Sequence, residues 1–560
     1  MYLNREATGS APPSTSAESG AVSAGGLARV RMALRRLTPE HLAVLALGLL
    51  VVVVHDVAYL LRQPFWTDEA WVAVSTRFPL SQLRETTSST PIGWSLLLRL
   101  FTERGEQTGR LLPLAFAGAA VVIAYRLGRG IGWQRREISV AAGLLTAIAV
   151  LLVPAMLVRD DLKQYTADAC LSLLALVLTS RLERDWSRGG LACLSVAVWG
   201  GMLCSDAVAF VGAAAFGALL VVQLCRGAWG RLAETAVTAV CTAVLMLAVY
   251  REFDAGPDYA GLKAYWSGFY LPIGKGLHAD LQFVTSRFHA VGADFGLGPA
   301  WLAIPLVAAG LVTMFRLGRP ATAVAVAILW PELLILSALR QYPFLDLRTS
   351  TFLFAITAAV AAMGLAGVCS LLRPRLNGLL AAGLAVAALT AFAAGVQPYV
   401  RSRMIPSEDV RDQARYIVAH EARRDVILVN LSSNWGFAYY WPAGAPARRP
   451  DTAVAQGYEA YFPDQPDIVV ARNRDLAAID EALAQALTVA RQHPCARIWV
   501  VRTHLSAQEK LAWRVALRQQ KVTLARAGQP GLGVIQIGGD RKSTRLNSSH
   551  SLSSRMPSSA

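Results

Sequence analysis

The sequence predicts a polytopic α-helical membrane protein with about eleven spans and a small C-terminal α/β domain outside the cytoplasm. Hydrophobic residues make up 54% of the 560 residues, only 16% are charged, and the mean hydropathy is +0.40. A soluble domain carries about 25% charged residues. Apolar stretches near 20 residues long, enough to cross a bilayer, recur between residues 42 and 396.

The distribution of arginine sets the expected topology. The net charge of +16 does not indicate nucleic-acid binding, because the arginines lie in short clusters between apolar runs, as the positive-inside rule describes. With the spans given next, all clusters fall on the same side of the membrane as the N-terminal arginines. The positive-inside rule makes that side, and the N-terminus, cytoplasmic. The predicted spans are 42–61, 110–128, 137–157, 162–180, 189–204, 206–225, 231–250, 298–316, 320–339, 349–372 and 377–396.

Both ends of the chain are expected to lie outside the folded parts. Residues 1–38 form a predicted disordered cytoplasmic tail, which is rich in Ser, Ala, Gly and Pro up to residue 28. Residues 541–560 contain eight serines without periodicity and resemble translated sequencing-adapter read-through, so we interpret them as non-native. Six of the seven cysteines lie in or beside apolar stretches, and their spacing indicates neither a metal site nor a disulfide framework.

Residues 39–400 form the predicted transmembrane domain, with outer loops at 62–109, 251–297 and 340–348. Within the first loop, Pro91 to Phe101 is apolar but only about eleven residues long, too short to span. We expect an interfacial helix there, with Trp94 and Arg99 at headgroup level.

Residues 401–540 form a predicted separate domain. Glu408 to Arg423 and Ser506 to Gln519 have helical periodicity, and the apolar runs 425–430, 497–502 and 533–537 read as strands. This alternation favours a small α/β domain.

An acidic pair, Asp68-Glu69, follows the first predicted span and lies between the aromatic residues Trp66 and Trp71. Carboxylates at a membrane surface are costly to place. Partial desolvation raises the pKa of such a group toward the range useful to a general base. An equally simple interpretation is that the pair begins an amphipathic interfacial helix, where acids favour the N-terminus.

Three further polar groups are predicted on the same outer face. They are Arg159 to Tyr165, which includes Asp161 and Lys163; Lys263 to Trp266; and Arg340 to Arg348, which includes Tyr342. Cations that hold a phosphate, rings that stack on a sugar and a carboxylate that accepts a proton suit an anionic lipid-linked sugar. Solvated loop charges, snorkelling arginines and an aromatic belt are the alternatives for these groups.

Taken in order, these motifs resemble the GT-C superfamily of membrane glycosyltransferases, near its bacterial protein-mannosyltransferase and aminoarabinose-transferase branch. The matching residues are Asp68-Glu69, the proline-led segment from Pro91 to Phe101, Arg110 to Pro113, Asp161 with Lys163 and Tyr165, and Tyr342-Pro343-Phe344 with Arg348. The resemblance covers about residues 40–400 and implies a bacterial plasma-membrane location.

The resemblance implies a polyprenyl-phosphate-linked sugar as donor and an envelope glycan, lipid or protein as acceptor. It makes Asp68, Glu69 and Asp161 the candidate catalytic acids, with Asp68 as the base and Asp161 orienting a substrate. The candidate donor-binding residues are Lys163, Tyr165, Lys263, Trp266, Arg340, Tyr342 and Arg348. Some members use a divalent metal such as Mg²⁺ or Mn²⁺, and no residue pattern here fixes one.

Two other function classes stay open. A lipid or solute transporter would use the same charges to bind and release cargo, and inverted repeats would favour it, although none is evident. A membrane-anchored binding or assembly protein would act through residues 404–538. Donor-dependent sugar transfer separates the three classes.

Overall fold

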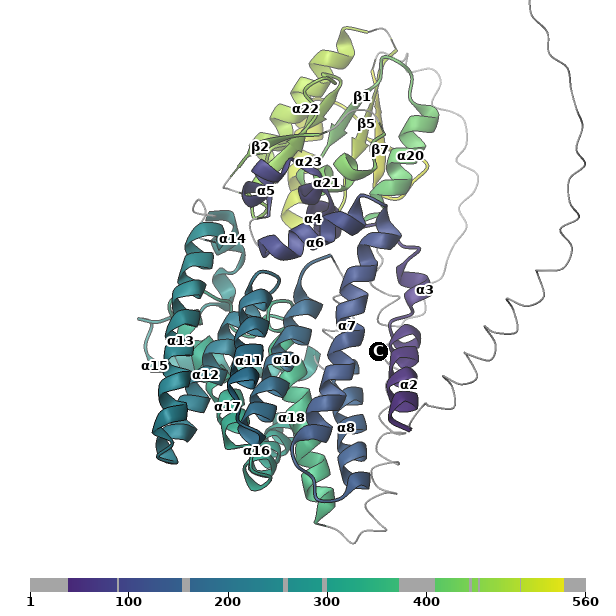
Figure 1. Cartoon of the computed structure of the whole chain (residues 1–560). Helices are drawn as coiled ribbons and strands as arrows, with labels where there is room; N and C mark the ends of the chain where they lie inside the picture. The colour runs from purple at the N-terminus through teal and green to yellow at the C-terminus, as the bar shows by residue number, and fades with distance from the viewer. Residues whose placement is uncertain are drawn as a thin grey trace, which may run out of the picture. The chain divides into compact units, whose positions relative to one another are not determined.

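The computed structural model describes residues 39–87, 90–153, 162–254, 260–294, 300–371, 408–442, 446–451, 454–493 and 495–537. The chain divides into two compact units, Met1–Leu50 and Val51–Ala560. Of the first unit, the structure describes only the beginning of helix α2 (Pro39–Val54). The second unit holds a helical part and an α/β part, whose elements are labelled in Figure 1.

The helical part alternates long helices with short ones in the loops. The helices before residue 203 are α3 (Val57–Leu60), α4 (Thr67–Arg77), α5 (Leu80–Thr86), α6 (Ile92–Thr102), α7 (Glu106–Gly130), α8 (Arg136–Leu151), α10 (Tyr165–Arg184) and α11 (Arg188–Met202). They are followed by α12 (Ala207–Cys225), α13 (Trp229–Val249), η1 (Tyr250–Asp254), α14 (Ala260–Tyr265), η2 (Ser267–Phe269), α15 (Leu277–Asp294), α16 (Ala300–Arg316), α17 (Pro320–Ala338) and α18 (Thr351–Ser370).

Six helices in the described part of the chain are long and apolar enough to cross a membrane: α7, α10, α12, α13 with η1, α17 and α18. The predicted spans 137–157, 189–204 and 298–316 correspond to the shorter helices α8, α11 and α16. The last predicted span, 377–396, lies outside the described residues. The multi-pass helical architecture agrees with the sequence, and the count of eleven spans stays a prediction.

The first predicted span, 42–61, is not one continuous helix. Helix α2 ends at Val54, and α3 begins at Val57. Asp56 between them adopts a left-handed backbone with φ of +44°, a conformation that cannot continue a right-handed helix.

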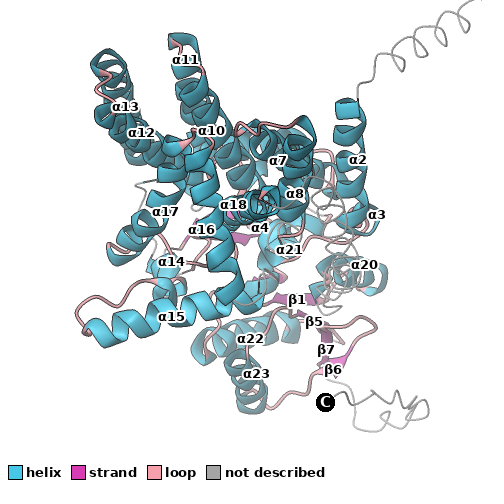
Figure 2. Ribbon diagram, turned by 90° about the horizontal axis from the view of Figure 1, so that it is seen from below, coloured by secondary structure: helices cyan, strands magenta, loops and turns pink. Residues whose placement is uncertain are grey.

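Close helix packing holds the bundle together. Figure 2 shows α18 among α7, α8, α10 and α16, all of which contact it. Most of α18 is buried because small residues such as Ala and Gly fill its sequence. At Gly310 and Gly364, where α16 crosses α18, an added Cβ atom would lie 2.1 and 2.0 Å from a carbonyl oxygen of the other helix. Only glycine permits this separation.

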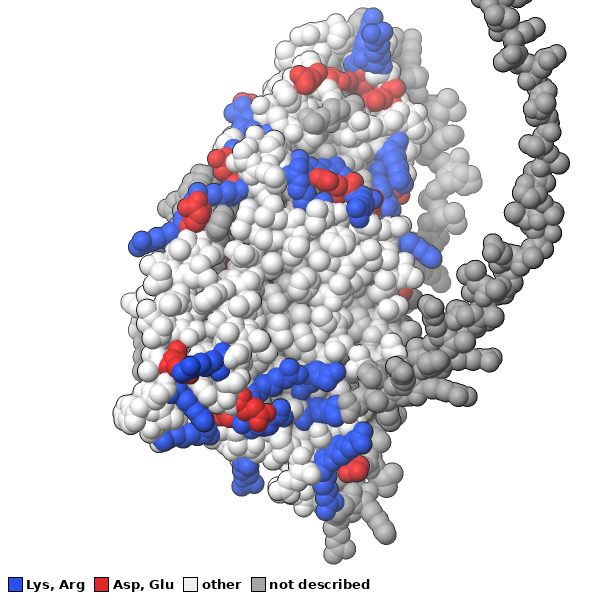
Figure 3. Space-filling view, viewed as in Figure 1, with Lys and Arg blue, Asp and Glu red and all other residues white. Residues whose placement is uncertain are grey.

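The surface charges match a membrane protein. On the face drawn in Figure 3, a broad band is nearly free of Lys, Arg, Asp and Glu, and charged side chains gather on both sides of it. Such a band is typical of helices that face lipid.

The predicted interfacial segment forms helix α6, which begins at Ile92 after Pro91. Trp94 is not an exposed headgroup anchor, because its side chain is fully buried, and the depth of α6 in a membrane stays a prediction. Its indole N–H donates to the carbonyl of Leu162 at 2.9 Å. Arg99 on the same helix is partly exposed and binds the carbonyl of Phe78 at 2.7 Å.

The C-terminal part has the mixed helix and strand content that the sequence predicts, but it belongs to the same compact unit as the helices and shares a core with α4 and α6. Its elements are α20 (Val410–His420), β1 (Val426–Val429), α21 (Leu431–Tyr440), β2 (Ala447–Pro450), β3 (Tyr458–Tyr461), β4 (Ile468–Val470), α22 (Leu476–Arg491), β5 (Arg497–Val501), α23 (Ala507–Gln519), β6 (Ala525–Arg526) and β7 (Leu532–Gln536). The main sheet has the order β4-β1-β5-β7-β6, and β2 and β3 form a separate hairpin. Strand β1 runs parallel to β4 and β5, while β7 is antiparallel to β5 and β6.

Alternate residues of the central strands enter two different cores. Val426 and Leu428 of β1 pack in the core with α22 and α23. Ile427 and Val429 pack on the opposite face, in a core that also contains residues of α20, α21, α4 and α6. Since strand side chains alternate between faces, this sheet buries both of them. One face thereby fixes α21 against helix α4.

Candidate active site

Helix α4 carries the predicted acidic pair in its first turn. Trp66 precedes the helix, and its backbone N–H donates to Oε2 of Glu69 at 3.3 Å, which caps the N-terminus. Consecutive helical residues point about 100° apart. Asp68 and Glu69 therefore face different surroundings: the side chain of Glu69 is 4% exposed, and that of Asp68 is 16% exposed.

Glu69 forms a buried ion pair with Arg110 of α7. Nε of Arg110 donates to Oε1 at 2.8 Å, and Nη2 donates to Oε2 at 2.5 Å. The remaining donors of Arg110 bind the carbonyls of Leu60, Gln63 and Pro64 at 2.6 to 2.9 Å. All five N–H groups of the guanidinium are therefore used, and Glu69 anchors the loop to α7.

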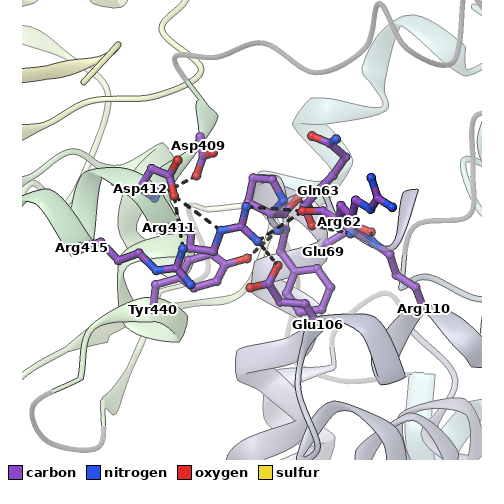
Figure 4. A network of polar contacts seen from close by, with 12 residues as sticks. Arg62, Gln63, Glu69, Glu106, Arg110, Asp409, Arg411, Asp412, Arg415 and Tyr440 are labelled. Carbon is purple, nitrogen blue, oxygen red and sulfur yellow. Dashed lines mark hydrogen bonds and ion pairs between the residues drawn. The ribbon is translucent and has the colours of Figure 1, made fainter. Parts of the chain in front are cut away.

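A second set of contacts ties this loop to the C-terminal domain, as Figure 4 shows. Arg411 of α20 binds Glu106 in the first turn of α7 at 3.0 Å. The hydroxyl of Tyr440, at the end of α21, accepts from the backbone N–H of Phe65 at 2.6 Å. The segment that leads into α4 is thus fixed from both sides.

Asp68 faces a cation from a distant part of the chain. Nη1 of Arg348 binds Oδ2 of Asp68, and the Arg348 guanidinium lies 5.2 Å from the ring centre of Trp66. Asp346 fixes the backbone of this loop, because its Oδ2 accepts from the N–H groups of Arg348 at 2.8 Å and Thr349 at 3.0 Å. The loop ends where α18 begins.

Lys163 lies on the same side of α4. Its Nζ is 4.6 Å from the ring centre of Trp71, which follows Asp68 by three residues. Residues spaced by three share one face of a helix, so Asp68 and Trp71 bring Arg348 and Lys163 to a common face. Lys163 is buried and lies two residues before the start of α10.

Tyr165 and Tyr342 belong to a polar cluster next to these cations. Burial raises the pKa of the Tyr342 phenol well above its usual range, and the nearby carboxylates of Asp168 and Asp206 raise it further. Its hydroxyl donates to the carbonyl of Thr349 at 2.7 Å. Tyr342 therefore stays neutral and braces the loop that carries Arg348.

Lys263 and Arg340 lie near a different residue, Tyr270, and Trp266 packs on the neighbouring Phe269. Burial raises the pKa of the Tyr270 phenol, and the positive charges of Lys263 and Arg340 oppose that rise. The ring of Trp266 lies 5.4 Å from that of Phe269. The structure thus places Arg348 at Asp68 and Arg340 in a second cluster.

The third predicted acid, Asp161, lies outside the described residues. Among the residues that the structure describes, no group of three or more His, Cys, Asp or Glu side chains is arranged to hold a metal ion. The use of a divalent metal such as Mg²⁺ or Mn²⁺ stays a prediction.

Sequence reasoning assigned no role to Asp206, Glu408 or His504. Asp206 accepts from the side chain of Gln164 at 3.1 Å. Glu408 and His504 form a hydrogen-bonded pair in the C-terminal domain, and the charge of Asp68 reaches His504. The sequence feature that could have marked Asp206 as functional is its position as an acidic residue at the start of the predicted span 206–225.

No model of a known protein family matches the chain, and no curated protein matches it. Among solved structures, the chain is similar to the crystal structure of ArnT from Cupriavidus metallidurans in the apo state, at 16% identity and a TM-score of 0.49. The match covers 88% of this chain and 97% of that chain. The function proposed below rests on the side-chain geometry.

Proposed function

We propose that this chain is a membrane glycosyltransferase of the GT-C type. It transfers a sugar from a polyprenyl-phosphate donor to an acceptor in the cell envelope, at the outer face of the plasma membrane. The acceptor is a glycan, lipid or protein. The proposal places the N-terminus in the cytoplasm and the C-terminal domain outside it.

One observation carries the proposal: a carboxylate, two cations and an indole ring share one face of α4, and a second indole ring lies just before the helix. Asp68 supplies the carboxylate, Arg348 and Lys163 the cations, and Trp66 and Trp71 the rings. Arg348 and Lys163 lie within three residues of the first residues of α18 and α10, both long enough to span a membrane. Helix N-termini carry partial positive charge, which adds to the attraction for a phosphate.

These groups support a direct displacement at the sugar. The acceptor oxygen forms a bond to the anomeric carbon while the bond from that carbon to the phosphate oxygen breaks. The phosphate oxygen keeps the electron pair, and the acceptor proton passes to the carboxylate of Asp68. Arg348 and Lys163 stabilise the charge that develops on the phosphate.

The ion pair between Asp68 and Arg348 fits this sequence of events. A donor phosphate competes with Asp68 for Arg348. When the phosphate takes the guanidinium, the carboxylate becomes available to the acceptor hydroxyl. Glu69, in contrast, stays paired with Arg110, so we assign it to the scaffold of the site.

The second cluster fits the sugar or the lipid of the donor. Lys263 and Arg340 supply positive charge, and Trp266 supplies a ring beside them. We propose that this cluster and Tyr165 line the approach to Arg348. If Asp161 is a ligand for a substrate or for Mg²⁺ or Mn²⁺, it would act from the loop that ends at Lys163.

The test is sugar transfer by the purified protein in proteoliposomes. A panel of radiolabelled polyprenyl-phosphate hexoses and pentoses is supplied with a cell-envelope extract as the source of acceptors. We expect label to enter the extract in proportion to the polyprenyl phosphate released. Movement of intact donor across the bilayer, with no release, would instead establish a transporter. If the protein neither transfers nor moves any donor, the binding or assembly role of residues 404–538 is favoured.

A further inference from the structure

The C-terminal domain presents the carboxyl ends of its parallel strands to α4. Strands β1 and β5 are parallel neighbours and end at Val429 and Val501. Asn430 follows β1 directly and Thr503 lies two residues after β5, and the Thr503 N–H donates to Asn430 Oδ1 at 3.3 Å. In open α/β sheets, ligands bind at this edge.

Helix α4 contacts this edge one residue before Asp68. The hydroxyl of Thr67 donates to the carbonyl of Ser432, in the first turn of α21, at 3.3 Å. Helices α4 and α21 pack along each other, as Figure 1 shows. The outer-loop helix that carries the proposed base therefore meets the domain where functional groups are expected.

A histidine–carboxylate pair lies at the same edge. His504 follows β5, and its Nδ1 is 2.9 Å from Oε1 of Glu408, a buried carboxylate. The His504 backbone has φ of +51°, in the left-handed region that non-glycine residues seldom adopt. The preceding residue, Thr503, is held in place by a hydrogen bond of 2.9 Å between its hydroxyl and that of Ser433. The pair is thus held in a defined place.

The charges around His504 favour its protonated form. The hydrogen bond to Glu408 raises the pKa of the imidazole most strongly, partial burial opposes it, and Asp68 raises it further. Arg474 lowers it, and the charge of His504 in turn acts on Glu509. Because coupling is reciprocal, a charged His504 stabilises the ionised form of Asp68 as much as Asp68 stabilises the charge of His504.

We propose that His504, held by Glu408, is a positioning residue supplied by the C-terminal domain that keeps Asp68 ionised while the donor phosphate occupies Arg348. The inference rests on the proposed function, in which the phosphate draws Arg348 away from Asp68. Each cation that remains near a largely buried carboxylate keeps it ionised, and His504 adds its charge to that of Lys163 when Arg348 is drawn away. A protonated Asp68 cannot accept the acceptor proton.

The expected consequence is a shift in the acid limb of the pH profile. His504→Asn removes the charge but keeps a residue that tolerates a left-handed backbone. Loss of this charge should lower the rate of transfer at pH 5 relative to wild type, because Asp68 is then protonated more readily, while transfer at pH 8 is unchanged. His504→Lys keeps a positive charge and should retain the wild-type limb.

The closing experiment combines this profile with ¹⁵N-histidine NMR of the full-length protein in nanodiscs. The His504 resonance is assigned by its absence from His504→Asn. Asp68→Asn should lower the pKa of His504, Glu408→Gln should lower it more, and Asp464→Asn, at an exposed position, should leave it unchanged. The inference is overturned if Asp68→Asn leaves the His504 titration unmoved, or if His504→Asn and wild type share one acid limb. If wild type transfers no sugar at any pH, the proposed function fails, and the NMR titration still decides whether the two residues are coupled.

Discussion

Arg110→Met should be among the most destabilising single substitutions at the junction of α7 with the loop before α4. The side chain of Arg110 is 2% exposed, and its partner Glu69 is 4% exposed. The substitution leaves the Glu69 carboxylate buried without its cation. It also removes the donors to the carbonyls of Leu60, Gln63 and Pro64.

The magnitude follows from burial. Removing one partner of a buried ion pair costs about 3–5 kcal/mol, because the other charge is left uncompensated. A surface pair contributes only about 0–1 kcal/mol. Arg188 gives a matched control, since it binds Glu234 at 2.8 Å while its side chain is 88% exposed. Arg188→Met should therefore be close to neutral.

The assay is thermal unfolding of purified protein in detergent, followed by size-exclusion chromatography at one heating rate for all variants. We expect Arg110→Met to unfold at a temperature well below that of wild type. Arg188→Met should unfold at the wild-type temperature. The double variant Arg110→Met/Glu69→Met should recover part of the loss, because no charge is left buried. Equal unfolding temperatures for Arg110→Met and Arg188→Met would refute the anchoring role of the pair.

Two further predictions concern the C-terminal domain. Burial raises the pKa of Glu459 in the folded protein to about 7 from an ordinary 4.5. Above pH 7 the buried carboxyl is ionised, which lowers the stability of the folded state by the full cost of this ionisation. Below pH 4.5 the carboxyl is protonated in both the folded and the unfolded state, and the cost is absent. Glu459→Gln should stabilise the protein by up to about 3 kcal/mol at pH 8 and by little at pH 4.5; a gain independent of pH in thermal unfolding would contradict this. Alkaline phosphatase fused after Gly538 should be active and a cytoplasm-only reporter at that place silent, and the reverse result would disprove the topology.

Local signals predicted the elements of the fold well. The strands around Val426–Val429 and Arg497–Val501 are short apolar runs bounded by polar residues. Helix α6 was predictable from the proline before it and from an apolar run too short to span a membrane. Strand β4 has only three residues, too few for a periodic signal. Helix α21 has little periodicity because nearly all of its residues are buried.

The site was predictable in its residue types and less so in its pairings. The sequence marks Asp68-Glu69 as a pair, but the two side chains separate only when α7 supplies Arg110 to one and a distant loop supplies Arg348 to the other. Tryptophan is a residue type that often anchors a helix at the headgroups, yet the Trp94 side chain is buried and donates to the carbonyl of Leu162. Such partners are set by tertiary packing, which no local pattern encodes.

The role of Arg348 in donor binding gives a contrast with the role of Asp68. Arg348→Ala removes a phosphate partner and should weaken binding of the polyprenyl-phosphate donor. It also frees Asp68 from its ion pair. The loss should therefore raise the donor concentration needed for half-maximal transfer, which Asp68→Asn leaves unchanged, and should also lower the rate because less charge on the phosphate is stabilised.

The rate of sugar transfer by Asp68→Asn tests the central claim most directly. The substitution keeps the shape of the side chain and removes its capacity to accept a proton. We predict a fall of about 10²–10⁴-fold in the rate at saturating donor, with folding and donor binding retained. A folded Asp68→Asn protein that binds donor and transfers sugar at the wild-type rate would contradict the assignment of Asp68 as the base.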